Sequence, residues 1–301
     1  MTNAKNFYLH ALSPLHVGAG RGLGYIDLPI VREKVTNYPY IPGSSVKGVI
    51  AEHYGATNDN RKNDPQLKAA FGISDGGADE TKSANSGSLV FTDARLLCLP
   101  VRSLYGTFAW ATSPTVLKRF RRDLTMTGAA GAPSIDGLKA EDKSALTTNV
   151  STLASGDKVY LEDLDLTVKP NAVADKWADF LAAQIFSADE QNDFKQRFVI
   201  LSDDVFNFLA ETGTEVSSHI KIDDDKKTAA GGALWYEESL PAETILAGVV
   251  WCDKVYGTAS LSEKDLLEKY AQTHEFLQFG GKATTGKGIV RFISAPAEGG
   301  K

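Results

Sequence analysis

Apolar residues that alternate with polar ones recur from one end of this chain to the other, with helical patterns between them. Residues 7–12 read as a strand that places Phe7, Leu9 and Ala11 on one face, and residues 288–293 read as a final strand. No linker divides the sequence between them, and domain boundaries usually fall in linkers. The pattern therefore predicts a single α+β domain over residues 1–301.

The same patterns predict the elements between these two strands. A strand pair or a bent strand is expected at 88–101, and single strands at 159–168 and 243–251. Helices are expected at 44–54, 113–124, 174–186, 189–201 and 264–279. Residues 214–223 and 233–240 are expected to pair as a β-hairpin with a long polar tip. Two polar, Gly-rich stretches are expected to be surface insertions: 56–88, around a short helix near 67–71, and 126–157, as a loop.

Composition and charge exclude several classes of protein. No apolar run approaches the roughly 20 residues that span a bilayer, and the N-terminus lacks a signal-peptide pattern, so we expect a cytoplasmic protein without a membrane partner. The two cysteines, Cys98 and Cys252, form neither a disulfide framework nor a zinc motif. With 38 acidic and 32 basic side chains the net charge is −6, which argues against unguided binding of nucleic acid.

The segment GGKATTGKG, residues 280–288, is the most informative local signal. Its four glycines allow backbone N–H groups to converge on an anion, and Lys282 and Lys287 add positive charge. Residues 281–287 match a phosphate-binding loop, but Gly288 stands where that loop requires Ser or Thr, and a strand pattern follows instead of a helix. An ATPase is therefore rejected. A plain turn, a contact to a polynucleotide backbone, and a small-molecule phosphate site remain as interpretations.

Three further groups of residues are compatible with anion binding. Ser44, Ser45 and Lys47 lie at the expected start of a helix, where ordinary capping explains the serines equally well. Arg21 lies in the loop GAGRGLG, which fails as a dinucleotide-binding motif and reads either as a plain loop or as one that approaches a phosphate. The basic run 118–122 is more typical of a solvated helix face.

Among the titratable residues, Asp27 stands out because it follows that glycine-rich loop, although a lone aspartate is more often a turn former or a surface charge. His16 is more typical of a structural histidine. Glu237 and Glu238, which close the expected hairpin, are as compatible with salt bridges as with a catalytic role. No hydrolase triad or zinc-protease motif is present.

Six blocks occur in an order that is similar to a known family. They are LSPLHVGAG, GYIDLPIVRE, YIPGSSVKGVI, SLVFTDARLLCLPVRSLYGTFAWATSP, LWYEESLPAET and FGGKATTGKGIVRF, between about residues 7 and 293. Together they resemble the RAMP superfamily of CRISPR proteins, and in particular the backbone subunit of type III-B (Cmr) effector complexes. The terminal Gly-rich block indicates only the superfamily, whereas GYIDLPI, ARLLCLPVRSLYGTFAW and LWYEESLPAET point to that subunit.

The resemblance implies a ferredoxin-like, RRM-type palm with helical insertions and a thumb hairpin at about 214–240. It implies a repeating subunit of a helical filament that binds a guide crRNA and other Cmr subunits. It further implies cleavage of the paired target RNA at regular intervals, where each thumb displaces a nucleotide, by metal-dependent attack of the 2′-OH with Mg²⁺ or Mn²⁺. The alternative is a non-catalytic, structural RNA-binding subunit of the same kind of filament.

The resemblance also assigns roles to residues. Asp27 falls in the family's catalytic G-x-x-D-x-P-I segment, as a metal anchor or a base, and Lys47 in its guide-contacting S-x-K-G turn. With Arg21 and Ser45, the Gly-rich loop is expected to contact RNA through Gly280, Gly281, Lys282, Gly286, Lys287 and Gly288. His16 and Glu238 lie in family blocks but are not assigned a chemical role. Because guide pairing supplies the sequence specificity, an acidic chain needs only a few local cations.

Overall fold

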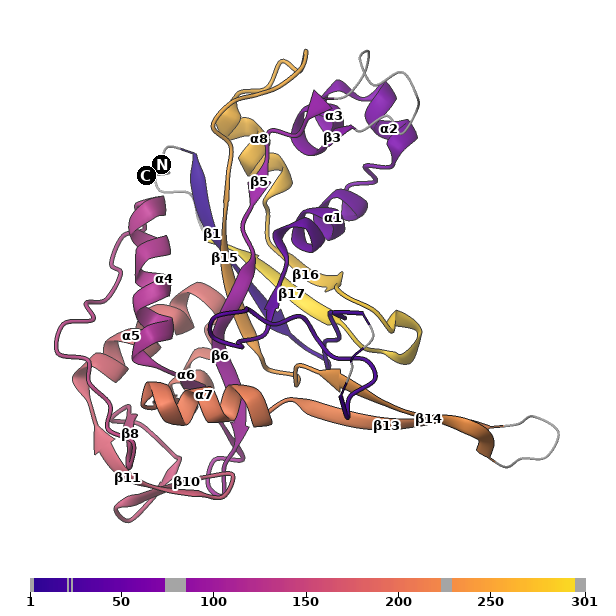
Figure 1. Cartoon of the computed structure of the whole chain (residues 1–301). Coiled ribbons are helices and arrows are strands. Elements are labelled where there is room, and N and C mark those ends of the chain that lie inside the picture. Colours follow the sequence, from indigo (N-terminus) through magenta and orange to yellow (C-terminus); the bar gives the residue numbers. More distant parts are fainter. Residues whose placement is uncertain (1–2, 21, 23, 74–84, 223–228, 296–301) are drawn as a thin grey trace.

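The computed structural model describes residues 3–20, 22, 24–73, 85–222 and 229–295, and the chain forms a mixed α+β structure (Figure 1). Its helices are α1 Gly43–His53, α2 Asn58–Asn63, α3 Pro65–Phe71, α4 Pro114–Thr127, α5 Ala172–Ile185, α6 Gln191–Arg197, α7 Asp203–Thr212 and α8 Glu263–Tyr270. Its strands are β1 Ala4–Ala11, β2 Tyr40–Ile41, β3 Gly72–Ile73, β4 Asn85–Ser86, β5 Val90–Phe91, β6 Ala94–Arg102, β7 Phe108–Thr112, β8 Ser144–Thr147, β9 Ala154–Ser155, β10 Lys158–Leu161, β11 Leu164–Pro170, β12 Phe198–Ile200, β13 Glu215–Ile222, β14 Ala229–Ser239, β15 Ile245–Trp251, β16 His274–Gln278 and β17 Ile289–Ser294.

One large mixed sheet forms the centre of the described chain. Its strands follow the order β16-β17-β1-β15-β6-β7-β12-β8-β11-β10-β9, with β2 beside β6 and β5 beside β15. The N-terminal strand β1 lies between β15 and the C-terminal strand β17, and pairs antiparallel with both. The first and last strands of the described chain therefore lie side by side, close to the β16 edge of the sheet.

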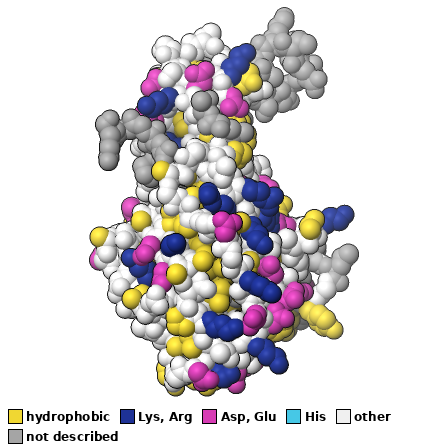
Figure 2. Space-filling model, turned by 90° about the vertical axis from the view of Figure 1, so that its left-hand side faces the viewer, with side chains coloured by type: hydrophobic (Ala, Val, Ile, Leu, Met, Phe, Trp, Pro, Cys, Tyr) yellow, Lys and Arg dark blue, Asp and Glu magenta, His cyan; other side chains and the backbone are white. Residues whose placement is uncertain are grey.

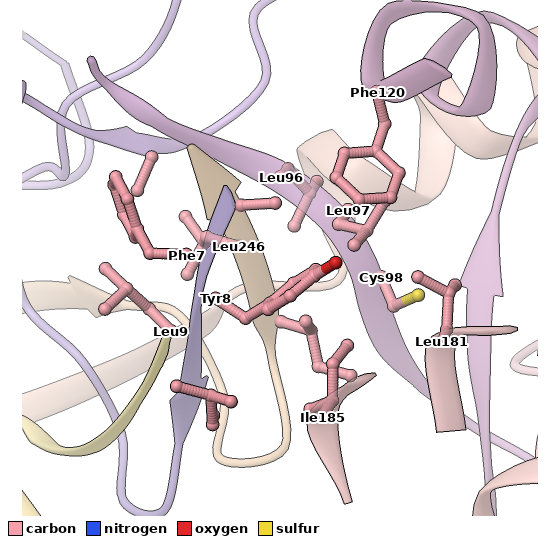
Figure 3. Close-up of a cluster of buried hydrophobic side chains, with 14 of the residues drawn as sticks. Phe7, Tyr8, Leu9, Leu96, Leu97, Cys98, Phe120, Leu181, Ile185 and Leu246 are labelled. Atoms are coloured by element: carbon pink, nitrogen blue, oxygen red, sulfur yellow. The ribbon is translucent and has the colours of Figure 1, made fainter. Parts of the chain in front are cut away.

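Strand β1 is buried on both faces. Phe7 and Leu9 project to one side of the strand, while Tyr8 projects to the other, toward Phe120 of α4 and Ile185 of α5 (Figure 3). Phe7 stacks on Phe292 of β17 at a ring-centroid distance of 5.4 Å. The expected face of Phe7, Leu9 and Ala11 is confirmed, and the alternate residues are covered as well because helices lie on both sides of the sheet.

The helices lie on both sides of this sheet, with α4 and α5 on one side and α1 and α8 on the other (Figure 1). Helix α4 begins as its sequence predicts, because the Ser113 side chain accepts a hydrogen bond from the N–H of Val116, and it ends at Gly128 in the left-handed conformation. Its charged face is solvated, as the basic run predicts: Lys118 and Arg122 are exposed. On this side of the molecule, Lys and Arg side chains alternate with Asp and Glu (Figure 2).

A long antiparallel hairpin, β13–β14, extends away from the body of the molecule (Figure 1). It pairs Val216 with Glu238 and Ile220 with Leu234, so these four side chains share one face. On the opposite face the ring of His219 stacks on Trp235 at 5.4 Å. The expected polar tip includes residues 223–228, which lie outside the described residues.

Several boundaries predicted from the sequence are wrong. The strand expected at 159–168 is two strands, β10 and β11, joined by a turn in which Glu162 has a φ of 49°. The helix expected at 264–279 ends at Tyr270, and the rest of that stretch contains strand β16. The helix expected at 189–201 ends at Arg197, and strand β12 follows it. In each case a short apolar run fits either periodicity, and pairing with a neighbouring strand decides the outcome.

The stretch 126–157 is also more than a loop. Residues Ser144–Thr147 form β8, which is buried in the main sheet between β12 and β11. In the other expected insertion, the helix near 67–71 is confirmed as α3, and residues 74–84 lie outside the described part. Among the described residues, the structure contains no helix that is both long and apolar enough to span a bilayer.

Candidate functional site

Three segments that are distant in sequence meet where the β13–β14 hairpin joins the body of the molecule. They are the segment 27–30 after the first glycine-rich loop, the root of β14 at Glu237–Ser239, and the C-terminal glycine-rich loop 280–288. Segment 27–30 has no strand of its own but lies parallel to β14 through a bridge between Leu28 and Glu237. This root brings Asp27, Lys282 and Lys287 into one region.

Asp27 is exposed and is anchored on the hairpin through both its backbone and its side chain. Its Oδ2 accepts a hydrogen bond of 2.8 Å from the N–H of Tyr236. The N–H groups of Asp27 and Leu28 both donate to the carbonyl of Tyr236, each at 3.1 Å. No hydrogen bond or ion pair engages Oδ1 among the described residues. One carboxylate oxygen is therefore fixed and the other is free to act.

Glu238 secures this segment from inside the molecule. It is buried, and its carboxylate accepts hydrogen bonds from Arg32 at 2.5 Å, from the hydroxyl of Thr214 at 2.9 Å and from the N–H of Ile30 at 3.0 Å. A buried carboxylate is stable only when its charge is compensated, and these three donors compensate it. Glu238 therefore holds segment 27–30, and the salt-bridge interpretation of this residue is confirmed.

His16 links strand β14 to the C-terminal loop. Its Nδ1 lies 2.6 Å from the carbonyl oxygen of Glu238. A carbonyl oxygen can only accept, so Nδ1 carries the proton and donates. The backbone carbonyl of His16 in turn accepts a hydrogen bond of 2.9 Å from Gly281. His16 is thus a buried structural residue here, as its isolated position in the sequence indicates.

The glycine-rich loop 280–288 connects two strands, β16 and β17, which agrees with the rejection of an ATPase loop. Gly288 has a φ of 81°, and a Cβ there would lie 2.0 Å from the carbonyl oxygen of Phe279. The N–H of Gly288 donates to Pro14, that of Gly281 to His16, and that of Gly286 to Ala283. Three of the four glycine N–H groups therefore close the loop itself in the free chain, and the expected contact of this loop with an anion stays a prediction.

Both lysines of the loop bind a glutamate of the hairpin. Lys287 contacts one oxygen of Glu237 at 2.8 Å and also donates to Ser239, while Lys282 lies 3.1 Å from the other oxygen. Burial works to raise the pKa of Glu237, but hydrogen bonds and attraction from Lys287 and Lys282 hold it below its ordinary value. The side chain of Lys282 is 36% exposed and that of Lys287 only 13%. Lys282 is thus the more accessible cation.

The remaining expected RNA contacts lie elsewhere. Helix α1 begins after Pro42, not after Ser44 or Ser45 as expected, and its first N–H, on Gly43, donates to the carboxylate of Asp93 at 2.8 Å. The ammonium of Lys47 donates to the carbonyl of Leu89 at 2.9 Å, and burial lowers its pKa, with repulsion from Arg61 adding to the effect. Ser45 is half-buried on the same helix. Arg21 lies outside the described residues.

Sequence reasoning missed two residues of this arrangement, Tyr236, which holds Asp27, and Arg32, which pairs with Glu238. Tyr236 acts through its backbone, which no side-chain motif can signal, and Arg32 is an isolated arginine without a motif around it. The sequence did hold one clue, because adjacent residues of a strand point to opposite faces. Glu237 and Glu238 therefore had to serve two different clusters, and they do so with Lys282 and Lys287 on one side and Arg32 on the other.

Comparison with known proteins identifies the family of this chain. Residues 8–291 match the family model of the RAMP superfamily. The chain is 31% identical over 288 residues to the CRISPR system Cmr endoribonuclease Cmr4 of Pyrococcus furiosus, covering 94% of this chain and 92% of the relative. It is 25% identical over 309 residues to the CMR subunit Cmr4 of Saccharolobus solfataricus, covering 96% of both chains.

Solved structures show the same fold. A crystal structure of oligomeric Cmr4 from Pyrococcus furiosus superposes with a TM-score of 0.71 at 25% identity and covers 98% of each chain. A subunit of a type III-B Cmr-beta complex bound to cognate target RNA gives a TM-score of 0.70 at 22% identity, covering 97% of this chain and 96% of that one. By family model and by full-length similarity, this chain belongs to the RAMP superfamily and lies among its Cmr4 subunits.

Proposed function

We propose that this chain is the repeating backbone subunit of a cytoplasmic type III-B CRISPR effector complex. It holds a guide crRNA together with copies of itself and other Cmr subunits, and cleaves the paired target RNA at regular intervals. The similarity to a relative named as an endoribonuclease supports this function. The observation that carries it is the exposed carboxylate of Asp27, hydrogen-bonded to the root of a protruding hairpin.

The strand order supports a ferredoxin-like, RRM-type palm. Four neighbouring strands, β17-β1-β15-β6, are all paired antiparallel. Numbered along the chain within this set, they are the fourth, first, third and second strands. Helix α1 lies in the connection from β1 to β6, and α8 in the connection from β15 to β17. This order matches the βαββαβ arrangement of a ferredoxin-like unit, with α4 to α7 and β7 to β14 added between β6 and β15.

The hairpin has the surface of a thumb that separates bases. Val216, Ile220 and Leu234 share one face and are exposed in the free chain. Apolar side chains of this kind unstack bases when they are inserted into a duplex, at a cost of a few kcal/mol per step. A displaced nucleotide next to this hairpin would expose its sugar–phosphate bond at the root, where Asp27 lies.

Cleavage then needs geometry more than it needs many functional groups. In a displaced nucleotide the 2′-oxygen can attack its own phosphorus in line with the leaving 5′-oxygen, which gives a 2′,3′-cyclic phosphate and a 5′-hydroxyl. The free Oδ1 of Asp27 can accept the 2′-OH proton, and the leaving oxygen takes a proton from water. Orientation of this kind contributes roughly 7–11 kcal/mol when it is well executed.

A divalent cation, Mg²⁺ or Mn²⁺, fits this site only if RNA shares it. The described residues contain no cluster of three or more His, Cys, Asp or Glu side chains that could hold a metal by themselves. Glu237 and Glu238 are committed to cations of the protein, which leaves one hard oxygen ligand, Oδ1 of Asp27. Phosphate oxygens and water would complete the octahedron that these ions prefer, and the ion would neutralise charge on the phosphate.

For RNA binding we propose Arg21, Ser45, Lys47, Gly280, Gly281, Lys282, Lys287 and Gly288. Lys282 is the first of these to be available, since it is partly exposed and shares Glu237 with a second lysine. Lys47 and Lys287 can bind a phosphate only by exchanging their present protein partners. The glycines of the loop carry no side chains, so an RNA strand can approach the loop backbone closely.

The assembled complex provides the test. Asp27→Ala should leave assembly and target binding unchanged and abolish cleavage at the regular intervals, whereas Asp163→Asn, an exposed aspartate in the β10–β11 turn, should cleave as wild type does. A 2′-deoxy substitution at one cut site should block that site alone.

A metal-rescue experiment distinguishes the two roles of Asp27. If Asp27 is a cation ligand, excess Mn²⁺ should restore part of the cleavage activity of Asp27→Asn. If Asp27 is the base, excess Mn²⁺ should not restore it. Absence of cleavage by the wild-type complex would favour the non-catalytic filament subunit.

A further inference from the structure

Tyr25 is the most exposed large apolar side chain of the described residues, with 98% of its surface accessible. Single exposed apolar residues are common on protein surfaces. Tyr25 differs because it lies two residues before Asp27, so their Cα atoms are no more than about 7 Å apart. A flat aromatic ring therefore stands in solvent next to the proposed catalytic carboxylate.

The backbone on either side of Tyr25 is tied down. Gly18 and Ile30 form a bridge, the N–H of Ala19 donates to the carbonyl of Pro29 at 2.9 Å, and that of Gly22 donates to the carbonyl of Asp27 at 3.0 Å. The last bond joins two residues that lie on either side of Tyr25, so Tyr25 belongs to an anchored segment. Since Asp27 is also held by Tyr236, the ring and the carboxylate share one support.

Charge near Asp27 does not favour the approach of RNA. Asp27 forms no ion pair among the described residues. Lys287 and Arg32 are largely buried against Glu237 and Glu238, and Lys282, which is partly exposed, shares Glu237 with Lys287. An unpaired carboxylate repels a phosphodiester. A contact that does not depend on net charge would therefore help to hold a nucleotide beside Asp27.

We propose that Tyr25 stacks on a nucleobase of the target RNA next to the scissile phosphate and so positions the displaced nucleotide against Asp27. This role rests on the proposed RNA cleavage. Stacking on an aromatic ring tolerates any base sequence, which suits a protein whose specificity comes from guide pairing. It needs a planar ring and no hydroxyl, and it depends only weakly on salt.

Substitutions at Tyr25 in the assembled complex follow from this role. Tyr25→Ala and Tyr25→Leu should each lower the single-turnover cleavage rate by roughly 10-fold to 100-fold, the loss expected for one base–aromatic stack. Tyr25→Phe should cleave within about 2-fold of wild type because it keeps the ring. The loss should be the same at low and high salt. A loss in Tyr25→Phe equal to that in Tyr25→Ala would overturn stacking.

A target RNA that lacks one base provides the sharper measurement. An abasic ribonucleotide is placed on either side of the scissile phosphate in turn, with its 2′-OH retained. One of the two should slow the wild-type complex as much as Tyr25→Ala does, and should cause no further loss in the Tyr25→Ala complex. Independent, additive losses would show that ring and base do not interact and would overturn the proposal.

A second readout does not depend on cleavage. In the Asp27→Ala complex, a target with 5-iodouridine next to the scissile position should photo-cross-link to Tyr25, and the cross-link should disappear in Asp27→Ala/Tyr25→Ala. A cross-link that maps to another residue would overturn the proposal even if the complex cleaves RNA normally. Failure of the proposed function would look different, because the wild-type complex itself would then not cleave.

Val35 provides the matched control, since it is 95% exposed and lies in the turn that follows the same segment. Val35→Ala should leave cleavage unchanged. If Val35→Ala and Tyr25→Ala lower cleavage equally, and both lower the number of copies per complex, then exposed apolar groups of this segment serve contacts between subunits, and the stacking role is wrong.

Discussion

The carboxylate of Asp27 accepts a hydrogen bond from the N–H of Tyr236, and the N–H of Asp27 donates back to the carbonyl of the same tyrosine. These two residues are 209 positions apart in the sequence. Tyr236 lies in the strand that continues outward as the protruding hairpin. Any shift of the hairpin root on RNA therefore moves the carboxylate with it, and the same contact orients the free oxygen of Asp27.

Removal of Glu238 should destabilise the chain strongly. Glu238→Ala leaves Nη2 of Arg32 and the N–H of Ile30 without their acceptor and removes the counter-charge of Arg32, so we expect the free energy of unfolding in urea to fall by roughly 3–5 kcal/mol. Glu162→Ala is the control, because its ion pair with Arg102 is largely exposed and should contribute less than about 1 kcal/mol. Equal effects of the two substitutions would contradict the supporting role of Glu238.

Glu237 should make stability depend on pH in the acid range. Its pKa is lower in the folded chain than its ordinary value of 4.5, so the unfolded chain binds more protons in this region. The stabilisation is therefore fully present above about pH 4.5 and is lost as the pH falls through the folded pKa. Glu237→Gln should be less stable than wild type at pH 6, and the difference should narrow toward pH 3 in urea midpoints. A difference that stays constant with pH would contradict this.

Two glycines of the C-terminal loop offer a comparison at similar backbone angles. Gly286 and Gly288 have φ values of 79° and 81°, but a Cβ at Gly286 meets no atom within 4 Å, whereas one at Gly288 meets the carbonyl of Phe279. Gly286→Ala should lower the free energy of unfolding by about 1–2 kcal/mol, the cost of the left-handed conformation for a residue with a Cβ. Gly288→Ala should lower it clearly more, because the backbone must also move to make room for the Cβ. Thermal unfolding of both variants tests this order.

The two lysines that share Glu237 should differ in their effects. Lys287→Ala removes the better buried partner and should lower the free energy of unfolding by roughly 2–4 kcal/mol. Lys282→Ala should change the free energy of unfolding by less than about 1 kcal/mol, because the side chain is partly exposed.

RNA binding tests Lys282 in its other proposed role. If Lys282 contacts phosphate, Lys282→Ala should weaken target RNA binding and reduce the salt dependence of the binding constant by about one counterion per copy. Unchanged RNA binding in Lys282→Ala would leave it with a structural role only.

The sequence predicted the elements that carry a long, regular pattern. The central strand with Phe7 and Leu9, the helix that starts at Ser113, and the hairpin of β13 and β14 all follow from periodicity and capping. The sequence-based prediction failed where a short apolar run fits both the helical and the strand periodicity. Residues His274–Gln278 were predicted as part of a helix but form an edge strand beside β17. Burial against neighbouring strands decides such cases, and one-dimensional patterns do not contain that information.

For the site, the sequence by itself determined which side chains are present, namely an aspartate after a glycine-rich loop, a pair of glutamates and two lysines between glycines. Only the tertiary structure decided what each one does. Glu237 and Glu238 neutralise nearby cations, three of the loop glycines close their own backbone, and Asp27 keeps one oxygen that no described residue engages. The physical reason is that a charge or an N–H group is available for chemistry only if no partner from a distant part of the chain has already engaged it.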